Sequence, residues 1–149
     1  MFTKEDLIYA YTTKQALEDG VLFKVEGTIP AECGITVPVY MTAAVWHKYV
    51  EVPKGMEGEQ DQEGRLWDVI YMFAFAMKAK LRQQNPDSPK LNLIHFEFIC
   101  RLPDKGDWES NEKRSGSRLM REVNLKAILS NQDIDDPSPA LFILKPMED

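Results

Sequence analysis

The residues best suited to chemistry in this 149-residue chain gather where a polar loop meets the longest apolar run. Asp61, Arg65 and Asp68 stand there, with Glu63 and Trp67 between them. A helix that starts at this point offers free main-chain amides and a dipole that stabilises negative charge. We therefore expect a pocket with catalytic carboxylates at Asp61 and Asp68, an anion-binding guanidinium at Arg65, and binding contacts from Glu63 and Trp67.

The same residues also have a structural interpretation. Asp61 or Glu63 can cap the helix, and Arg65 can pair with Asp68, three residues further along the same face. A carboxylate among buried apolar residues requires such a partner. From the sequence, both interpretations stay open.

The two histidines add one candidate. His47 stands four residues before Glu51, a spacing that suits an acid–base couple or two metal ligands. Two ligands are too few to hold a metal, so we expect none and take His47 as the fourth candidate catalytic residue. His95 and Glu97 form a His-x-Glu pair, but the Pro-Cys-x-x-Cys half of the zinc deaminase signature is missing.

Several common functions lack their motifs. The chain has no phosphate-binding Gly-x-x-x-x-Gly-Lys-Ser/Thr loop, no Gly-x-Gly-x-x-Gly fingerprint and no Gly-x-Ser-x-Gly elbow. We therefore expect no cofactor. The net charge of −6 argues against nucleic acid as the main partner, because binding to the phosphate backbone requires clustered Lys and Arg.

The cysteines and the first residues indicate the compartment. Cys33 and Cys100 have no neighbour at metal-ligand spacing, which favours two reduced, buried thiols over a disulfide between them. Acidic residues stand where a secretory signal would have its apolar core. We expect a cytoplasmic protein.

One long helix is expected to position the candidate site. Every residue from Val69 to Met77 is apolar or aromatic, and a helix that is apolar all round lies inside a protein or a membrane. A membrane span needs roughly 20 such residues, about twice this run. The sequence therefore predicts a central buried helix over residues 64–84 of a protein that does not cross a membrane.

Shorter elements precede this helix. Residues 3–11 suit either a short helix or an extended arm. The other expected elements are a helix over Lys14 to Asp19 capped by Thr12 or Thr13 and ended by Gly20, a buried strand over Val21 to Val25, a helical turn within Gly27 to Thr36, and a helix over Ala43 to Val50 capped by Thr42.

After the helix the hydrophobic period changes to two. This alternation predicts strands over Asn92 to Leu102, Leu119 to Leu129 and Ala140 to Leu144, with a mobile charged loop over Asp104 to Gly116. The order of elements predicts a single α+β domain, residues 1–149, in which helices pack on one face of an antiparallel sheet of about four strands. If Ala140 to Leu144 forms an edge strand, it offers a surface for a homodimer.

Three segments together resemble a known group of proteins. They are Tyr11 to Leu22, Ala44 to Trp46, and Asp61 to Val69. They resemble an uncharacterised family, a domain of unknown function, found in small bacterial, plasmid-borne and phage-borne proteins. The resemblance implies a genetic setting and transfers no activity.

Two functions follow as hypotheses. The first is a non-catalytic binding or accessory protein of a mobile element or bacterial host, which acts through protein–protein contacts of its helical face and acidic junction. The second is a small hydrolase or transferase that uses Asp61, Asp68 and His47 as acid–base groups, with Arg65 holding an anionic substrate. The second hypothesis predicts that the four side chains surround one concave pocket.

Overall fold

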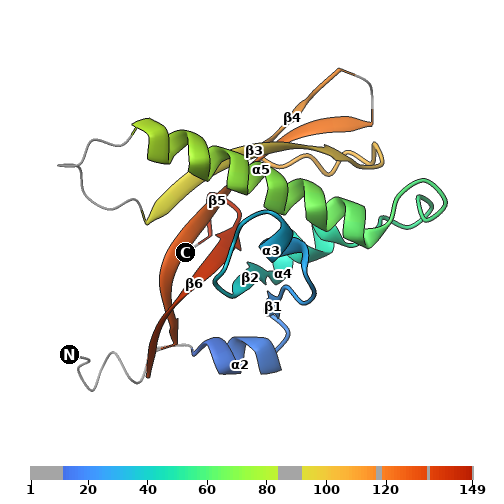
Figure 1. Ribbon diagram of the computed structural model, residues 1–149. Helices are drawn as coiled ribbons and strands as arrows, with labels where there is room; N and C mark the ends of the chain where they lie inside the picture. Colours follow the sequence, from blue (N-terminus) through green and yellow to red (C-terminus); the bar gives the residue numbers. More distant parts are fainter. Residues whose placement is uncertain (1–11, 84–91, 117–118, 134, 149) are drawn as a thin grey trace.

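Helices and a β-sheet make up the described part of the chain, which confirms the α+β class. The computed structural model describes residues 12–83, 92–116, 119–133 and 135–148, so the expectation for residues 3–11 lies outside it. The elements, in chain order (Figure 1), are α2 (Thr13–Glu18), β1 (Leu22–Lys24), α3 (Ile29–Glu32), β2 (Val39–Thr42), α4 (Ala43–Val45), the π-helical turn η1 (Trp46–Val50), α5 (Gln62–Gln83), β3 (Leu93–Arg101), β4 (Glu112–Arg114), β5 (Met120–Asp133) and β6 (Asp136–Leu144).

The sheet is mixed and has six strands, so the prediction of about four antiparallel strands is wrong. Its order is β1-β2-β6-β5-β3, and β4 pairs with the first part of β5. β2 and β6 are parallel, and the other neighbours are antiparallel. The sequence analysis missed β2 and β4 because strands of three or four residues are too short to show a period of two.

β6 lies inside the sheet, between β5 and β2. The prediction that residues 140–144 form an exposed edge for a homodimer is therefore wrong. In the described sheet the outer strands of the main path are β1 and β3. As an edge strand, β1 is only half-buried, which corrects the expectation of a buried first strand.

Several local signals in the first half of the chain are confirmed. The Thr12 hydroxyl accepts a hydrogen bond from the Gln15 amide at 3.0 Å, and the Gln15 side chain accepts one from the Thr12 amide at 3.2 Å. This reciprocal capping box starts α2. Gly20 ends that region with a φ of 73°, a backbone conformation that favours glycine. Thr42 caps α4 by accepting the Val45 amide.

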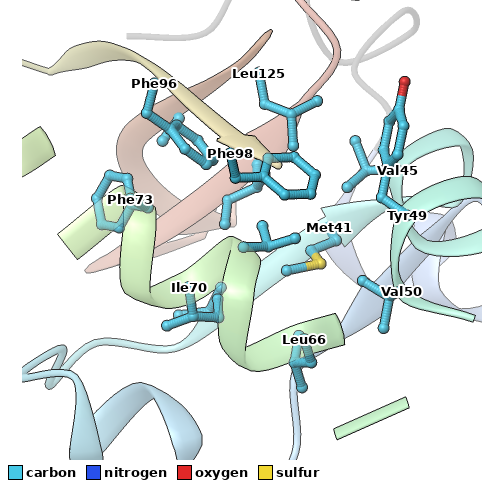
Figure 2. Close-up of a cluster of buried hydrophobic side chains, with 14 of the residues drawn as sticks. Met41, Val45, Tyr49, Val50, Leu66, Ile70, Phe73, Phe96, Phe98 and Leu125 are labelled. Atoms are coloured by element: carbon cyan, nitrogen blue, oxygen red, sulfur yellow. The ribbon is translucent and has the colours of Figure 1, made fainter. Parts of the chain in front are cut away.

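α5 packs across one face of the sheet (Figure 1). It buries Leu66, Ile70 and Phe73 in a core shared with β2, β3, β5 and η1 (Figure 2). Phe73 meets Phe96 of β3 edge to face, with ring centroids 5.7 Å apart. On β3 the alternating residues Ile94, Phe96, Phe98 and Cys100 are buried, as the period of two predicted.

The opposite side of α5 is open to solvent. Trp67, Tyr71 and Phe75 expose 37%, 50% and 60% of their surface. The prediction of a helix buried all round is therefore wrong, because a helix on one face of a single sheet buries only the side that meets the sheet. None of the described helices combines the length and the apolar character needed to cross a membrane.

Candidate functional site

The loop before α5 and the first two turns of the helix line a cavity of about 610 Å³. Three of the four predicted catalytic residues contribute to it, together with Trp67. The lining residues are Glu57, Gly58, Glu59, Gln60, Asp61, Gly64, Arg65, Trp67 and Asp68. The cavity therefore carries four carboxylates and a single guanidinium, which makes it acidic.

Asp61 caps α5. Its Oδ1 accepts the Gly64 main-chain N–H at 2.6 Å, and its carbonyl oxygen accepts the Arg65 N–H at 3.2 Å. A Cβ on residue 64 would lie 2.8 Å from that Oδ1, so glycine permits the close approach. Glu63 is exposed in the first turn and does not line the cavity. Of the two capping candidates, Asp61 takes the role, which leaves its carboxylate facing both the helix amides and the cavity.

Arg65 is buried and bonded to uncharged acceptors. Nη1 donates to Gln60 Oε1 and to the Arg101 carbonyl oxygen, each at 2.8 Å. Nη2 donates to the Lys48 carbonyl oxygen at 3.1 Å and to Cys100 Sγ at 3.4 Å. Its buried Nε has no partner among the described residues. The guanidinium thus ties the loop, η1 and the end of β3 together, and its terminal nitrogens are not free to hold an anion.

The Cys100 thiol beside this guanidinium is not poised to react. Burial raises its pKa to about 11, although Arg65 acts in the opposite direction. A thiol with that pKa stays protonated at neutral pH. Cys100 and Cys33 are both buried and free, as the sequence predicted.

Asp68 remains without a hydrogen bond or ion pair to any described residue, and the expected Arg65–Asp68 pair does not form. Its side chain lies at the surface, where it lines the acidic cavity and also a second hollow beside β3. Partial burial raises the pKa of its carboxyl above the ordinary value of 3.8, while the nearby Arg65 charge opposes the rise.

Trp67 and Tyr71 form an aromatic surface next to Asp68. Their rings stack with centroids 5.9 Å apart and planes 18° from parallel. Phe75 continues the line one turn further along α5. The spacing of four residues places the three rings in one stripe on the solvent side of the helix.

His47 lies apart from this cavity. It sits on η1, is exposed, and its Nδ1 contacts Glu51 Oε1. Its ring meets Phe23 of β1 edge to face at 5.2 Å. His47 and Glu51 are therefore in contact, but His47 does not line the cavity that Asp61, Arg65 and Asp68 share.

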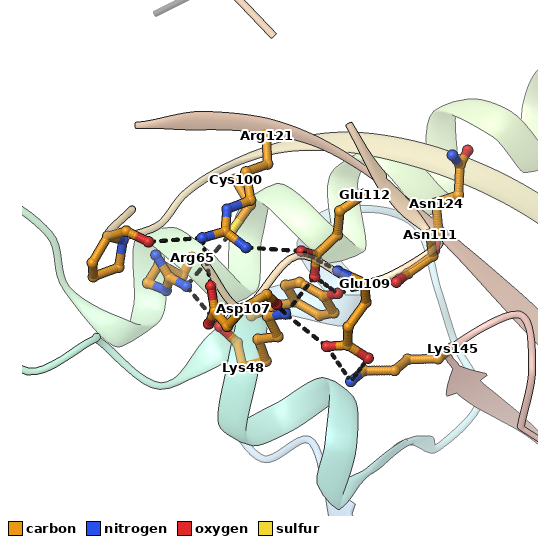
Figure 3. Close-up of polar contacts among 12 residues, drawn as sticks. Lys48, Arg65, Cys100, Asp107, Glu109, Asn111, Glu112, Arg121, Asn124 and Lys145 are labelled. Atoms are coloured by element: carbon orange, nitrogen blue, oxygen red, sulfur yellow. Dashed lines mark hydrogen bonds and ion pairs between the residues drawn. The ribbon is translucent and has the colours of Figure 1, made fainter. Parts of the chain in front are cut away.

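The sequence analysis missed a buried polar cluster between η1, the 104–116 segment, β5 and the end of β6 (Figure 3). Its centre is the Glu112 carboxylate, whose side chain has no exposed surface. Lys48 Nζ lies 2.8 Å from Glu112 Oε2, and Arg121 Nη1 lies 2.8 Å from Oε1. The Tyr49 hydroxyl donates to the same carboxylate.

Further charged residues surround the central Glu112 group. Arg121 Nη2 donates to Asp107 Oδ1 at 2.8 Å and to the Pro103 carbonyl oxygen at 2.7 Å. Lys145 Nζ lies 2.7 Å from Glu109 Oε1, and Trp108 covers the Arg121 guanidinium at 4.1 Å. The 104–116 segment is thus held by ion pairs, and it contains the strand β4, so it is not a loop throughout as expected.

The cluster holds its acids ionised. Burial disfavours the charged form of Glu112, but hydrogen bonds from Lys48, Tyr49 and Arg121 hold its pKa below the ordinary value. Burial raises the pKa of Tyr49, and the adjacent Glu112 raises it further. The sequence did contain one signal: Arg121 stands in step with Val123, Leu125 and Ala127 on the apolar side of its strand, a position where a charge requires buried partners.

A comparison with known protein families identifies the family of the chain. A family of unknown function (DUF6573) matches residues 1–106. The chain belongs to this family. The DUF6573 region contains α5, the acidic cavity and β3, whereas Glu112 and Arg121 lie beyond it. No curated protein and no solved structure matches the chain.

Proposed function

We propose that this DUF6573 protein is a protein-binding module, and that its binding surface is the acidic cavity together with the stacked Trp67 and Tyr71. The observation that carries the proposal is an exposed aromatic pair beside Asp68, a carboxylate with no ion pair among the described residues. The occupant we propose is a segment of another protein that presents Arg or Lys next to apolar residues.

Charge supports a basic partner. Glu57, Glu59, Asp61 and Asp68 line the cavity, and the one cation in its wall, Arg65, donates inward. Glu59 pairs with Arg101 at 3.0 Å, but both side chains are well exposed, so this pair can open at low cost. A partner's cation near Asp68 would find an acceptor that no described residue occupies.

The aromatic pair supports the same partner. A cation over the face of an exposed Trp or Tyr contributes about 0.5–1 kcal/mol, and more when water is excluded. Apolar residues next to that cation would cover the Trp67 and Tyr71 rings. The removal of these rings from water would stabilise the complex. Aromatic residues are also enriched at the centres of protein interfaces.

The test is selection of peptides displayed on phage with the full chain as bait. We expect the recovered peptides to be enriched in Arg or Lys beside aromatic or aliphatic residues, and their affinity to fall as salt is added. Trp67→Ala and Asp68→Asn should each weaken the best peptide about tenfold. Glu63→Gln is the matched control, since it removes a carboxylate of the same helix turn that lies outside the cavity.

Two results would end the proposal. One is recovery of peptides with no preference for basic residues. The other is a peptide whose affinity is unchanged by both Trp67→Ala and Asp68→Asn.

The alternative function is a small hydrolase or transferase, and one observation favours it: Asp61, Arg65 and Asp68 line the same cavity. Two observations make it the weaker proposal. The Arg65 terminal nitrogens already donate to main-chain and side-chain acceptors, and His47 lies elsewhere on η1. If the alternative holds, hydrolysis of an anionic aryl ester should be lost in Asp68→Asn and kept in Glu63→Gln.

We also propose a cytoplasmic accessory role in a mobile element or its bacterial host. The free, buried Cys33 and Cys100 support a reducing compartment. The resemblance to plasmid-borne and phage-borne proteins supports the genetic setting. The net charge of −6 supports a protein rather than nucleic acid as the partner.

A further inference from the structure

The open edge of β3 has main-chain groups without partners. β3 pairs with β5 only, through alternate residues: the Asn92 carbonyl oxygen accepts the Leu129 N–H, and the Leu102 N–H donates to the Leu119 carbonyl oxygen. Even-numbered residues therefore face β5, and odd-numbered residues direct their N–H and C=O groups outward. No hydrogen bond from another described residue reaches the main chain of Leu93, His95, Glu97 or Ile99.

The series of outward-facing main-chain groups without a partner ends before Arg101. The Arg101 carbonyl oxygen, the next in the series, already accepts hydrogen bonds from Arg65 and Gln60. The available edge thus extends from Leu93 to Ile99, with Phe96 at its centre. Natural edge strands are commonly protected by Pro, by a bulge or by charged side chains, especially Lys; this segment has no Pro, no Lys and no bulge, and Glu97 is its one acidic residue.

The side chains along this edge are complementary to those of the same strand in a second copy of the chain. In a two-fold antiparallel pairing centred on Phe96, Leu93 meets Ile99 of the second copy, and His95 meets Glu97 of the second copy. The apolar pair would cover two side chains that are 42% and 43% exposed in the single chain. The His–Glu pair would also give Glu97 an imidazole partner from the second copy. In the single chain, the hydrogen bond between Glu97 and the neighbouring carboxyl of Glu122 raises the pKa of Glu97.

The neighbouring register centred on Glu97 fits less well. A centre on Glu97 would place the two Glu97 carboxylates opposite each other, and like charges opposite each other destabilise a strand pair. It would also need Arg101 in the ladder, although its carbonyl oxygen is already occupied. The register centred on Phe96 avoids both problems.

α5 is consistent with the same two-fold arrangement. Phe73 packs on Phe96, so the middle of the helix lies level with the centre of the edge. Asp68 and Arg82 stand seven residues on either side of the exposed Phe75. A two-fold rotation would bring the Asp68 end of one α5 towards the Arg82 end of the other, which matches opposite charges.

We propose that the protein forms a homodimer in which the β3 edges of two copies pair antiparallel about Phe96 and the two sheets become continuous. The β3 edge itself lies outside the acidic cavity, although Asp68 and Tyr71 of the proposed peptide-binding surface also line the hollow beside β3. The dimer would present two acidic cavities and could therefore bind a bivalent partner with increased avidity.

The test is multi-angle light scattering of the full chain over a range of concentrations. The expected mass is twice 17.1 kDa. Glu97→Pro removes one outward N–H without touching the β5 ladder, and should weaken the dimer at least about tenfold. The matched control is Lys24→Pro on β1, whose N–H also points outward, because the inward hydrogen bonds of this strand are made by Val25 to Val39 and by Val21 to Ala43. It should leave the dimer unchanged.

A charge exchange tests the register. His95→Glu places two carboxylates opposite each other and should weaken the dimer about tenfold, whereas the double variant His95→Glu/Glu97→His restores the pair and the dimer. Far-UV circular dichroism confirms that each variant is folded. A wild-type monomer at every concentration would overturn the proposal, as would a dimer that survives both Glu97→Pro and His95→Glu. Neither variant changes the acidic cavity, so peptide binding is tested independently.

Discussion

Glu112 is the residue whose replacement tests the energetics of this fold most directly. Its carboxylate is fully buried and lies 2.8 Å from both Lys48 Nζ and Arg121 Nη1. Glu112→Gln keeps the shape and a carbonyl acceptor but removes the charge. The positive charges of Lys48 and Arg121 would then remain buried without the negative charge of Glu112 to balance them.

The size of the effect follows from what each cation retains. Removing one member of a buried ion pair typically costs 3–5 kcal/mol, because the other charge is left without a counter-ion. Lys48 keeps Glu109 at 2.6 Å and Arg121 keeps Asp107 at 2.8 Å, but both carboxylates are partly exposed. We therefore expect the lower end of that range, a loss of about 3 kcal/mol in the free energy of unfolding.

Lowering the pH should destabilise the wild-type protein for the same reason, because protonation removes the negative charge of Glu112. The folded-state pKa of Glu112 lies below its ordinary value of 4.5, so its stabilisation is complete above about pH 4.5 and is lost as the pH falls towards the folded pKa. Asp107 and Glu109 are shifted in the same direction by their hydrogen bonds to Arg121 and to Lys145 and Lys48, although burial opposes both shifts. The Glu112→Gln protein should therefore lose less stability than the wild type between pH 5 and pH 3.

The assay is urea denaturation at pH 7 and at lower pH, followed by circular dichroism and tryptophan fluorescence. Glu109→Gln is the control, because its carboxylate is 38% exposed and should contribute at most about 1 kcal/mol. A Glu112→Gln protein no less stable than Glu109→Gln, or one with the acid sensitivity of the wild type, would refute the reasoning.

Two further pairs of substitutions test α5. Phe73→Ala removes a buried ring from the core and should cost about 3–5 kcal/mol in the same denaturation assay, whereas Phe75→Ala, two residues away on the solvent side, should change stability by less than about 1 kcal/mol. Asp61→Ala removes the cap of α5 and should cost about 0.5–2 kcal/mol, whereas Glu63→Ala should cost clearly less, because Glu63 does not cap the helix; equal losses would contradict the assigned cap.

Signals carried by single residues or by long periodic segments were sufficient for much of the fold. Thr12 with Gln15 predicted the start of α2, and Thr42 predicted that of α4, because capping depends on groups only three residues apart. The alternation along β3 predicted its buried face. Strand order could not be predicted, because the parallel pairing of β2 with β6 joins segments about 100 residues apart and leaves no local signal.

The candidate site was predicted in part for a related reason. Asp61, Arg65 and Asp68 are close in sequence and do share a cavity, since one helix start positions them all. The partners of Arg65 were not predictable from its neighbourhood, because two of its acceptors are the carbonyl oxygens of Lys48 and Arg101, groups that every residue carries. A residue type therefore indicated where a charge lies, but not what it binds.

The exposed side of α5 shows how an error in burial changes a functional conclusion. Apolar residues all round a helix indicate that every side is covered, but they do not say by which molecule. Here the sheet covers the side of Ile70 and Phe73, and the side of Trp67, Tyr71 and Phe75 faces solvent in the single chain. Water is a poor environment for three aligned aromatic rings. If the proposed function holds, the apolar character of this side of the helix reflects contacts with a partner protein, and Trp67→Ala is the variant that tests it.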